Sequence, residues 1–575
     1  MIQKISFQNY KAFEKGEIKL KPITILLGAN SVGKSSIIHF LLMLQQTANS
    51  TDYKSALRLH GENISMGECK NIFRNQITSN NIVIDFEFKN ENLKELLKKR
   101  LLNDFTSQLS QYIQFSFQFS PKEVNESLLK NELNKFINKK GEINKKLYNS
   151  KEDFQKLIKV IKYLNNNKSK LKSKKQPNSL GFYYQKYGEN FILNNEKLLE
   201  LYNFLVEVEN IKNDLFNLSF ELRNVKFKKE NVLKMRSVSL MNNNKQILRI
   251  KFYLNRSKTE YKNIAIMSNF ANGQKLFNSK TKKDFLKLID FNTTIFSWLR
   301  LPRDISRYLY RNKNIYLYNF DSEEYSITTR TLIQIMGQAV VSVKDEFKKQ
   351  FVNHVNPLRA YPQRYYSLDK ANIHTTLNSL DGNSLTEILK ENTIVRNKVN
   401  TWLKTFKLQV NVSTLQDVIH KLKIRQHSLD LDITDVGFGI SQILPVIVQS
   451  FLSSEDSLTM IEQPEIHLHP KMQAELADLF IDVTQENLSG KKHLLIETHS
   501  EYLLRRLRRR ISEGKISAQD VAIYFIAKPK GEKSSAKIQE KKVSENGFFE
   551  WPQDFYAKEL IEDTTEFLKQ SIRKK

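Results

Sequence analysis

The 575-residue sequence has only one cysteine, Cys69, and no long apolar run. A single cysteine cannot form an intrachain disulfide, which fits a reducing compartment. A membrane-spanning helix needs about 18–20 mostly apolar residues, whereas the best candidate, residues 443–452, is too short and contains Pro445 and Gln449. Residues 1–5 also lack the apolar core of a signal peptide. We therefore expect a cytoplasmic protein that does not enter a membrane.

Acidic residues are scarce relative to basic ones. Asp and Glu total 62 against 91 Lys and Arg, so the formal net charge is +29. This excess predicts a polyanionic partner, with nucleic acid as the first candidate and double-stranded DNA as one possible form of it. A Lys/Asn-rich block at 92–212 is one candidate surface, and a solvated helix face is the alternative for it. The same alternative applies to a second candidate, the arginines Arg505, Arg506, Arg508, Arg509 and Arg510.

Residues 28–35, GANSVGKS, match the phosphate-binding pattern G-x-x-x-x-G-K-[ST]. An apolar β-branched run at 23–27 precedes the match and an apolar helical pattern at 36–44 follows it, which is the strand–loop–helix context that the pattern requires. A turn with a chance lysine is the alternative. In a phosphate-binding loop, backbone N–H groups and the helix N-terminus hold the phosphates of ATP. The predicted ATP contacts are Asn30, Ser31, Val32, Gly33, Lys34, Ser35 and Ser36, with the Ser35 hydroxyl also binding Mg²⁺.

The rest of the chain divides by pattern. Apolar and polar residues alternate at 82–89, 218–222 and 250–254, which predicts half-buried antiparallel strands. The block at 92–212 interrupts them with leucines among lysines and glutamates, and reads as a helical insertion. The predicted fold class is α/β, a P-loop NTPase with an antiparallel lobe and a helical insertion. We expect domains at 1–91, 92–212, 213–354, 355–525 and 526–575.

Two aromatic side chains near the N-terminus, Tyr10 and Phe13, lie between short predicted strands. They could stack on adenine, but packing under the sheet is the favoured interpretation. Residues 355–365 form a turn with two prolines and two arginines, Arg359 and Arg364. We expect these arginines to bond nearby backbone carbonyls.

The C-terminal third contains more polar groups at element ends. Ser441 and Gln442 follow a glycine-containing loop and begin an apolar helix, which predicts a second anion site, with a simple helix cap as the alternative. A buried strand at 458–461 leads into Glu462, Gln463 and Glu465, an arrangement suited to holding Mg²⁺ and aiming a water. Another buried strand at 493–496 is followed closely by His499, at the edge where α/β sheets bind ligands.

The order of these motifs resembles the ABC-type ATPase heads of the SMC, RecF and OLD families. The matching phrases are GANSVGKSS, NPLRAYPQRYY, DVGFGISQILPV, IEQPEIHLHP and ETHSEYLL. They are most similar to a bacterial subgroup often described as AAA-type ATPases with a C-terminal domain of unknown function. Residues 547–555 resemble that C-terminal domain. The resemblance covers about 1–90 and 355–575.

The resemblance implies a head-to-tail dimer around two ATP molecules, with a higher homo-oligomer as the alternative. Lys34 and Ser35 would bind phosphate and Mg²⁺, Ser441 of the other protomer would contact the γ-phosphate, and His499 would sense it. The wider family ends the acidic strand in Asp-Glu, but this chain has Glu462-Gln463. Gln463 can orient a water but cannot take its proton, and Glu465 is the nearest substitute base. We expect slow hydrolysis or a role as a dimerisation switch.

The resemblance also implies a role as sensor and regulator in a bacterial anti-phage defence system. We find no nuclease signature, so a nuclease or toxin effector is expected to be a separate protein. The alternatives are a RecF-like DNA-repair or DNA-clamping ATPase, and a weakly hydrolysing scaffold with ATP bound. A transporter ATPase fits least, because the signature lacks the Leu-Ser-Gly-Gly-Gln form.

Overall fold

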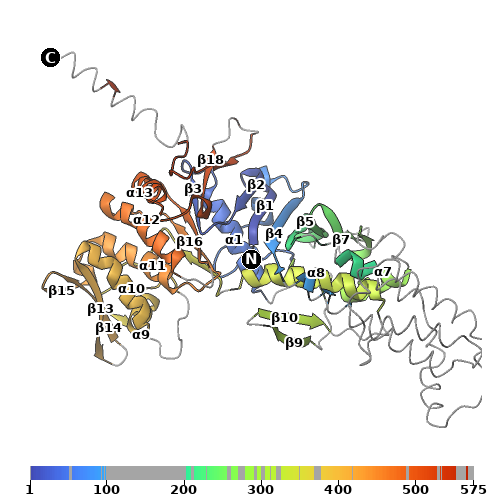
Figure 1. The fold of residues 1–575 in the computed structure, drawn as a ribbon, viewed down its shortest axis with the longest axis horizontal. Helices are drawn as coiled ribbons and strands as arrows, with labels where there is room; N and C mark the ends of the chain where they lie inside the picture. The colour runs from blue at the N-terminus through green and yellow to red at the C-terminus, as the bar shows by residue number, and fades with distance from the viewer. Residues whose placement is uncertain are drawn as a thin grey trace, which may run out of the picture.

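The computed structural model describes most of residues 2–101, 203–269, 279–367 and 377–551, with short gaps, and residues 565–566. Figure 1 shows three parts side by side: a central sheet with helices, a second sheet that carries α8 (Ile327–Glu346), and a small lobe around β13 (Leu408–Gln416). The predicted insertion at 92–212 lies mostly outside the described residues.

The central sheet has six strands and carries the phosphate-binding pattern. All neighbouring strands are parallel except the last pair. Its order is β11 (Val352–Val355), β16 (Leu458–Glu462), β17 (His493–Glu497), β3 (Ile23–Leu27), β18 (Val521–Ala527) and β19 (Lys537–Lys541). Every residue of β3, β16 and β17 is buried, as the apolar runs predicted. The predicted α/β class is therefore confirmed.

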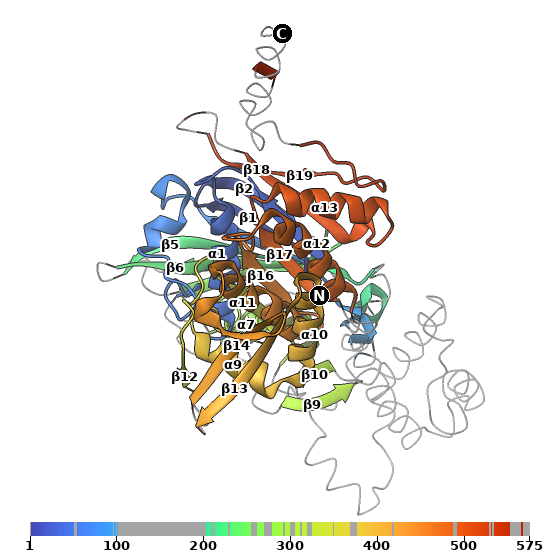
Figure 2. The same cartoon turned by 90° about the vertical axis from the view of Figure 1, so that its left-hand side faces the viewer.

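Helices cover this sheet, and two of them begin at residues that favour a helix start. Figure 2 shows α11 (Phe438–Leu452), α12 (Pro470–Gln485) and α13 (Glu501–Ser512) together on one face. Pro470 occupies the first turn of α12, and the Ser500 hydroxyl caps α13 by accepting from the Leu503 N–H. None of the helices in the described part of the chain combines the length and apolarity that crossing a membrane requires.

The second sheet has seven antiparallel strands and forms the predicted antiparallel lobe. In sheet order they are β2 (Phe13–Lys19), β1 (Ile2–Tyr10), β4 (Ile82–Lys89), β5 (Leu215–Phe227), β6 (Glu230–Asn242), β7 (Lys245–Leu254) and β8 (Tyr261–Met267). Alternate residues of β4 are buried, as its sequence pattern predicted. The helices α7 (Ser279–Leu288) and α8 pack on this sheet, and the hairpin of β9 (Ile305–Tyr310) and β10 (Lys313–Tyr318) lies near α8.

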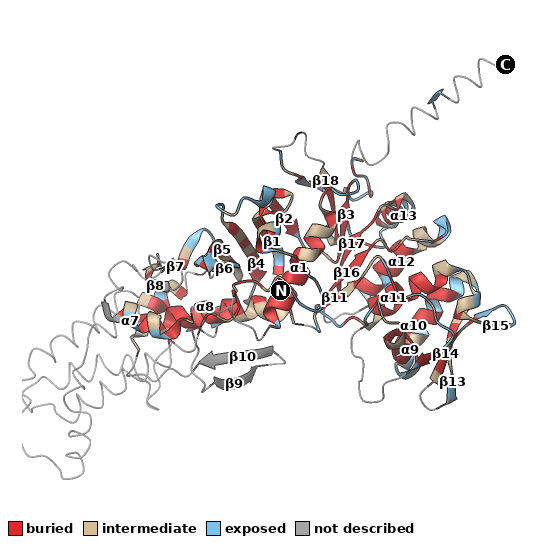
Figure 3. Cartoon of the chain, turned by 180° about the vertical axis from the view of Figure 1, so that it is seen from behind, coloured by how far each residue is buried: buried red, intermediate tan, exposed pale blue. Residues whose placement is uncertain are grey.

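Helix α1 (Lys34–Ala48) joins the two sheets. Phe40 lies with its ring 5.0 Å from that of Tyr10 in β1, and the Gln45 amide donates to the Val352 carbonyl of β11 at 2.7 Å. Tyr10 and Phe13 are fully buried in this region, so both pack under the sheet and neither is available to stack on a base. Figure 3 shows buried residues along the strands of both sheets and along α1 and α8.

The small lobe inserts between β11 and α11. It comprises β12 (Tyr366–Ser367), α9 (Gly382–Glu391), α10 (Thr393–Leu403), β13, β14 (Ile419–Gln426) and β15 (Leu429–Asp432). Side chains of Asp381 and Asn392 cap its two helices. Short 3-10 turns occur at Cys69–Ile72, Arg74–Gln76, Lys404–Phe406, Ile433–Asp435 and Ala518–Asp520.

The expected boundary between residues 525 and 526 falls inside β18. Because β18 pairs with β3 and with β19, the central sheet continues to Lys541. Beyond it, Phe549 is buried in the same core as the inner face of α13. Both β19 and Phe549 therefore pack with the head.

Candidate functional site

The loop between β3 and α1 has the geometry of a phosphate cradle. Gly28 and Gly33 have φ angles of 149° and 113°, and Ser31 has a φ of 63°. A Cβ at Gly28 would lie 2.6 Å from the Ile526 carbonyl oxygen, and one at Gly33 would lie 2.9 Å from the Phe13 ring. Both positions therefore require glycine, which lets the loop backbone curl toward the start of α1.

Lys34 lies inside this loop. Its side chain is 4% exposed, and Nζ donates to the carbonyl oxygens of Gly28 at 3.1 Å and Ala29 at 2.8 Å. Nζ also lies 3.8 Å from Glu497 Oε1. Burial lowers the pKa of Lys34, and the negative charge of Glu497 opposes that change. The lysine is thus held beside the loop that would bind phosphate.

Glu497 is a candidate site residue that sequence reasoning missed. Ser35 Oγ donates to its two oxygens at 3.3 and 3.0 Å. Burial, together with repulsion from Glu462, raises the pKa of Glu497 to about 7. The available signal was an acid at the last position of a buried strand.

Strand pairing explains why these groups meet. Glu462 and Glu497 are register partners on β16 and β17, and Glu497 pairs with Leu26 of β3. The carboxyl ends of the three parallel strands therefore lie at one sheet edge, beside the loop. Ser35 and Glu462, which were predicted as Mg²⁺ ligands from separate motifs, therefore lie at the same edge of the sheet.

Gln463 follows Glu462 in an unusual conformation, with a φ of 44°. Its N–H donates to the Glu497 carbonyl oxygen at 2.8 Å. One residue of β11 and one of the loop that follows β11 also contact this turn. His354 Nε2 lies 2.8 Å from Glu462 Oε1, and Arg359 Nη2 donates to the carbonyls of Glu462 and Gln463 at 2.8 and 3.2 Å. The expectation of carbonyl partners is confirmed for Arg359, although these carbonyls are distant in sequence. For Arg364 it is wrong, because its guanidinium donates to the Asp435 carboxylate at 3.2 Å.

Glu465 and His499 are linked to each other. The Thr498 hydroxyl and the His499 N–H donate to the two Glu465 oxygens at 2.8 and 2.7 Å. Burial raises the pKa of Glu465, although these hydrogen bonds oppose the shift. Burial and the charge of Lys34 lower the pKa of His499, whose Nε2 has no hydrogen-bond partner among the described residues. His499 is therefore held near the lysine with one ring nitrogen available.

The donor set fits ATP with Mg²⁺. Glu462, Glu497 and Ser35 offer hard oxygen ligands, which Mg²⁺ prefers. A cation between the two carboxylates would also relieve the repulsion that raises the pKa of Glu497. The two glycines let the loop backbone curl toward the start of α1, where backbone N–H groups and the helix N-terminus could hold phosphate.

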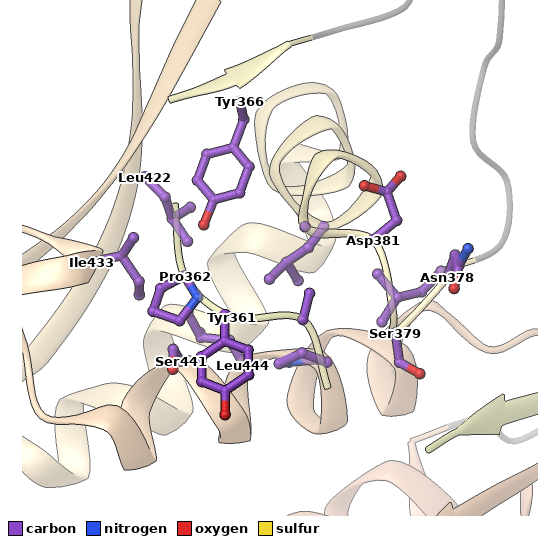
Figure 4. A pocket seen from close by; sticks show the side chains of 15 residues that line it. Tyr361, Pro362, Tyr366, Asn378, Ser379, Asp381, Leu422, Ile433, Ser441 and Leu444 are labelled. Carbon is purple, nitrogen blue, oxygen red and sulfur yellow. The ribbon is translucent and has the colours of Figure 1, made fainter. Parts of the chain in front are cut away.

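Ser441 and Gln442 lie apart from this edge, in the first turns of α11. Ser441 is 7% exposed, and its hydroxyl donates to the Phe438 carbonyl at 2.7 Å. Gln442 Nε2 donates to the Ala360 carbonyl at 3.5 Å. Figure 4 shows Ser441 beside Tyr361 and Pro362, at a pocket between α11 and the small lobe. The exposed backbone at this end belongs to Gly437.

The arginine-rich helix α13 is not a free basic surface. Four of its arginines pair with acids on α12, on α13 or just after it: Arg505 with Glu501, Arg506 with Glu475, Arg509 with Glu513, and Arg510 with Asp478 and Glu513. Arg508 donates to the Gly547 carbonyl at 3.2 Å and lies over the ring of Phe549. The structure favours a solvated helix face over a DNA-binding surface for α13, because the charge of its arginines is largely balanced within the chain.

Comparison with known proteins adds a family. Two solved structures are similar at low identity: the SMC head domain from Thermotoga maritima (6% identity, TM-score 0.31, 94% of this chain and 98% of that chain), and the Smc head domain with an extended coiled coil bound to the C-terminal domain of ScpA from Pyrococcus furiosus (10% identity, TM-score 0.31, 100% and 99%). At these values neither bears on what this chain binds. The search of curated proteins found no match. The family described as "AAA ATPase domain" matches residues 1–504, and the chain belongs to that family.

Proposed function

We propose that this protein is a cytoplasmic ATPase that binds ATP with Mg²⁺ in the 28–36 loop and hydrolyses it slowly. The observation that carries the proposal is the meeting of Lys34, Ser35, Glu462 and Glu497 at one sheet edge. Lys34 would exchange its loop carbonyls for phosphate oxygens. Ser35 and Glu462 would hold Mg²⁺, which supplies charge neutralisation at the phosphates.

Slow turnover follows from the groups that face the reaction. Gln463 can hold a water through its amide but has no basic site to take a proton. Glu465, the substitute base expected from the sequence, already accepts hydrogen bonds from the 498–499 turn at both its oxygens. His499, whose Nε2 has no hydrogen-bond partner among the described residues, would sense the γ-phosphate. ATP would then persist long enough to act as a switch.

The same proposal includes a head-to-tail dimer. The helix start at Gly437 and Phe438 presents backbone N–H groups and a positive dipole end. This start would face the γ-phosphate held by a second copy. Ser441 would support that contact from inside, since its hydroxyl bonds the Phe438 carbonyl. The Ser441→Arg variant should therefore block ATP-dependent dimers, as judged by light scattering.

The test is nucleotide binding and turnover of the Lys34→Ala variant. We expect loss of ATP binding or a fall in kcat/KM of about 100-fold or more, because a positioned phosphate ligand is removed. Lys19→Ala, which removes an exposed lysine paired with Glu540, is the control. Unchanged turnover in Lys34→Ala would remove the assignment of the loop.

At the level of the cell, we propose that ATP-driven dimerisation regulates a separate effector, a nuclease or toxin, in anti-phage defence. This part is supported by the motif resemblance alone. Plating of phage on cells that express the protein with its neighbouring genes tests it, and protection that survives Lys34→Ala would contradict it.

A DNA-clamping ATPase is the second candidate, favoured by the +29 charge. It predicts turnover that DNA stimulates and DNA binding that weakens steeply with salt.

A further inference from the structure

The loop that follows β11 touches two separate parts of the proposed ATP site. At its start, Arg359 is 4% exposed and donates from Nη2 to the carbonyls of Glu462 and Gln463. Arg359 Nε and Nη1 have no hydrogen-bond partner among the described residues. The two carbonyls are thus the only hydrogen-bonded anchors that the described residues offer this buried guanidinium.

A few residues later the same loop contacts the start of α11. The Ala360 carbonyl accepts from Gln442, the Tyr361 ring lies 5.4 Å from that of Phe438, and Arg364 pairs with Asp435 at 3.2 Å. Figure 4 shows Tyr361 and Pro362 lying along α11. Residues 359–364 therefore connect the end of β16 with the helix start that would face a partner copy.

The start of α11 also contacts the turn that follows Glu465. The Phe438 ring lies 4.9 Å from that of His467, and a Cβ at Gly439 would lie 2.5 Å from the His467 carbonyl oxygen. His467 belongs to the turn that follows Glu465, and it has a φ of 62°. A shift of the start of α11 would thus move both the 359–364 loop and the turn beyond Gln463.

We propose that Arg359 is a positioning residue that fixes Gln463, and that residues 359–364 couple this residue to the α11 start of the same protomer. The inference rests on the proposed dimer. In that dimer the α11 start senses the nucleotide of the partner, so occupancy of one site sets the geometry of the other.

The physical reason is the backbone of Gln463. A non-glycine residue in the left-handed region is strained and persists only when its surroundings hold it. The Glu497 carbonyl holds the Gln463 N–H from one side and Arg359 holds the carbonyls from the other. The planar guanidinium reaches both carbonyls with one nitrogen, whereas a lysine is a single point charge on a shorter reach.

The first variant is Arg359→Lys, which keeps the charge. We expect kcat to fall about 30-fold with KM within about threefold, because water is misoriented while ATP contacts remain. The Hill coefficient for ATP should fall to about 1 from a higher wild-type value. A merely structural role would instead lower Tm and weaken ATP binding together, and that result, or an unchanged kcat, would overturn the positioning role.

A second variant keeps the test decisive if Arg359→Lys fails to fold. Tyr361 is 78% exposed, so Tyr361→Ala should fold. We expect it to lower the Hill coefficient while light scattering still finds ATP-dependent dimers. Tyr502→Ala, at an exposed tyrosine of α13, is the matched control and should match wild type. A wild-type Hill coefficient in Tyr361→Ala would overturn the coupling. A Hill coefficient of about 1 in the wild type would overturn it as well.

Failure of the proposed function is visible separately, in the wild-type protein. If the wild type binds ATP without turnover, hydrolysis is refuted, and the coupling is read from the Hill coefficient of ATP binding. If it binds no ATP, the proposed function falls and the inference falls with it. If the wild type hydrolyses ATP as proposed, and Arg359→Lys and Tyr361→Ala have the same kcat and Hill coefficient as the wild type, the inference alone is wrong.

Discussion

Replacing Glu497 with glutamine should stabilise the nucleotide-free protein and weaken its use of Mg²⁺. Glu497 is 4% exposed and carries a pKa of about 7 because of burial and the nearby Glu462. In the unfolded chain its pKa is about 4.3. The unfolded state therefore loses its proton first, and this group lowers stability as pH rises from about 4 through 7.

The size of the effect follows from that difference. Above pH 7 the folded protein carries the full penalty, which amounts to about 4 kcal/mol. Glu497→Gln removes the charge and keeps the shape, so we expect a Tm higher by about 2–4 °C at pH 8 in EDTA. The same change removes an oxygen donor beside Ser35, so the Mg²⁺ needed for half-maximal turnover should rise about 10–100-fold.

Scanning fluorimetry in EDTA and Mg²⁺ titration of ATP turnover measure the two effects. Glu540→Gln, which removes a carboxylate at the edge of the same sheet, is the control and should change neither. A lower Tm in EDTA would show that Glu497 is not a repelled acid. An unchanged Mg²⁺ requirement would separate Glu497 from the metal site.

Three further changes have defined outcomes. Gln463→Glu supplies a base and should raise kcat about 10-fold or more in steady-state turnover; no change would mean that this side chain does not face the water. Gly439→Ala should lower Tm and abolish ATP-dependent dimers, because its Cβ would meet the His467 carbonyl at 2.5 Å; a wild-type dimer signal in light scattering contradicts this. Burial lowers the pKa of His493 to about 4, so the unfolded state takes up this proton first and stability falls by up to about 3 kcal/mol from pH 6.5 to 4. His493→Gln should flatten that part of the Tm profile, and parallel profiles would refute it.

Local chemistry allowed much of this molecule to be predicted from its sequence. The apolar run at 23–27, the two loop glycines and the following helix specify the phosphate cradle, because each requirement lies within about 20 residues. Alternation at 82–89 predicted β4 and its buried face for the same reason. The buried strands before Glu462 and His499 were also clear from composition alone.

Only the tertiary structure decided which distant groups meet. Placing β17 between β16 and β3 sets Glu497 beside Ser35, and no local pattern specifies that order. Arg359 reaches carbonyls more than a hundred residues away, and two arginines of α13, Arg506 and Arg510, pair with acids of α12. Sequence patterns record burial and turns within one element, whereas strand order and side-chain partners depend on contacts between elements. For that reason the phosphate-binding loop was predictable from the sequence, whereas the positions of Glu497 beside it and of Arg359 behind Gln463 were not.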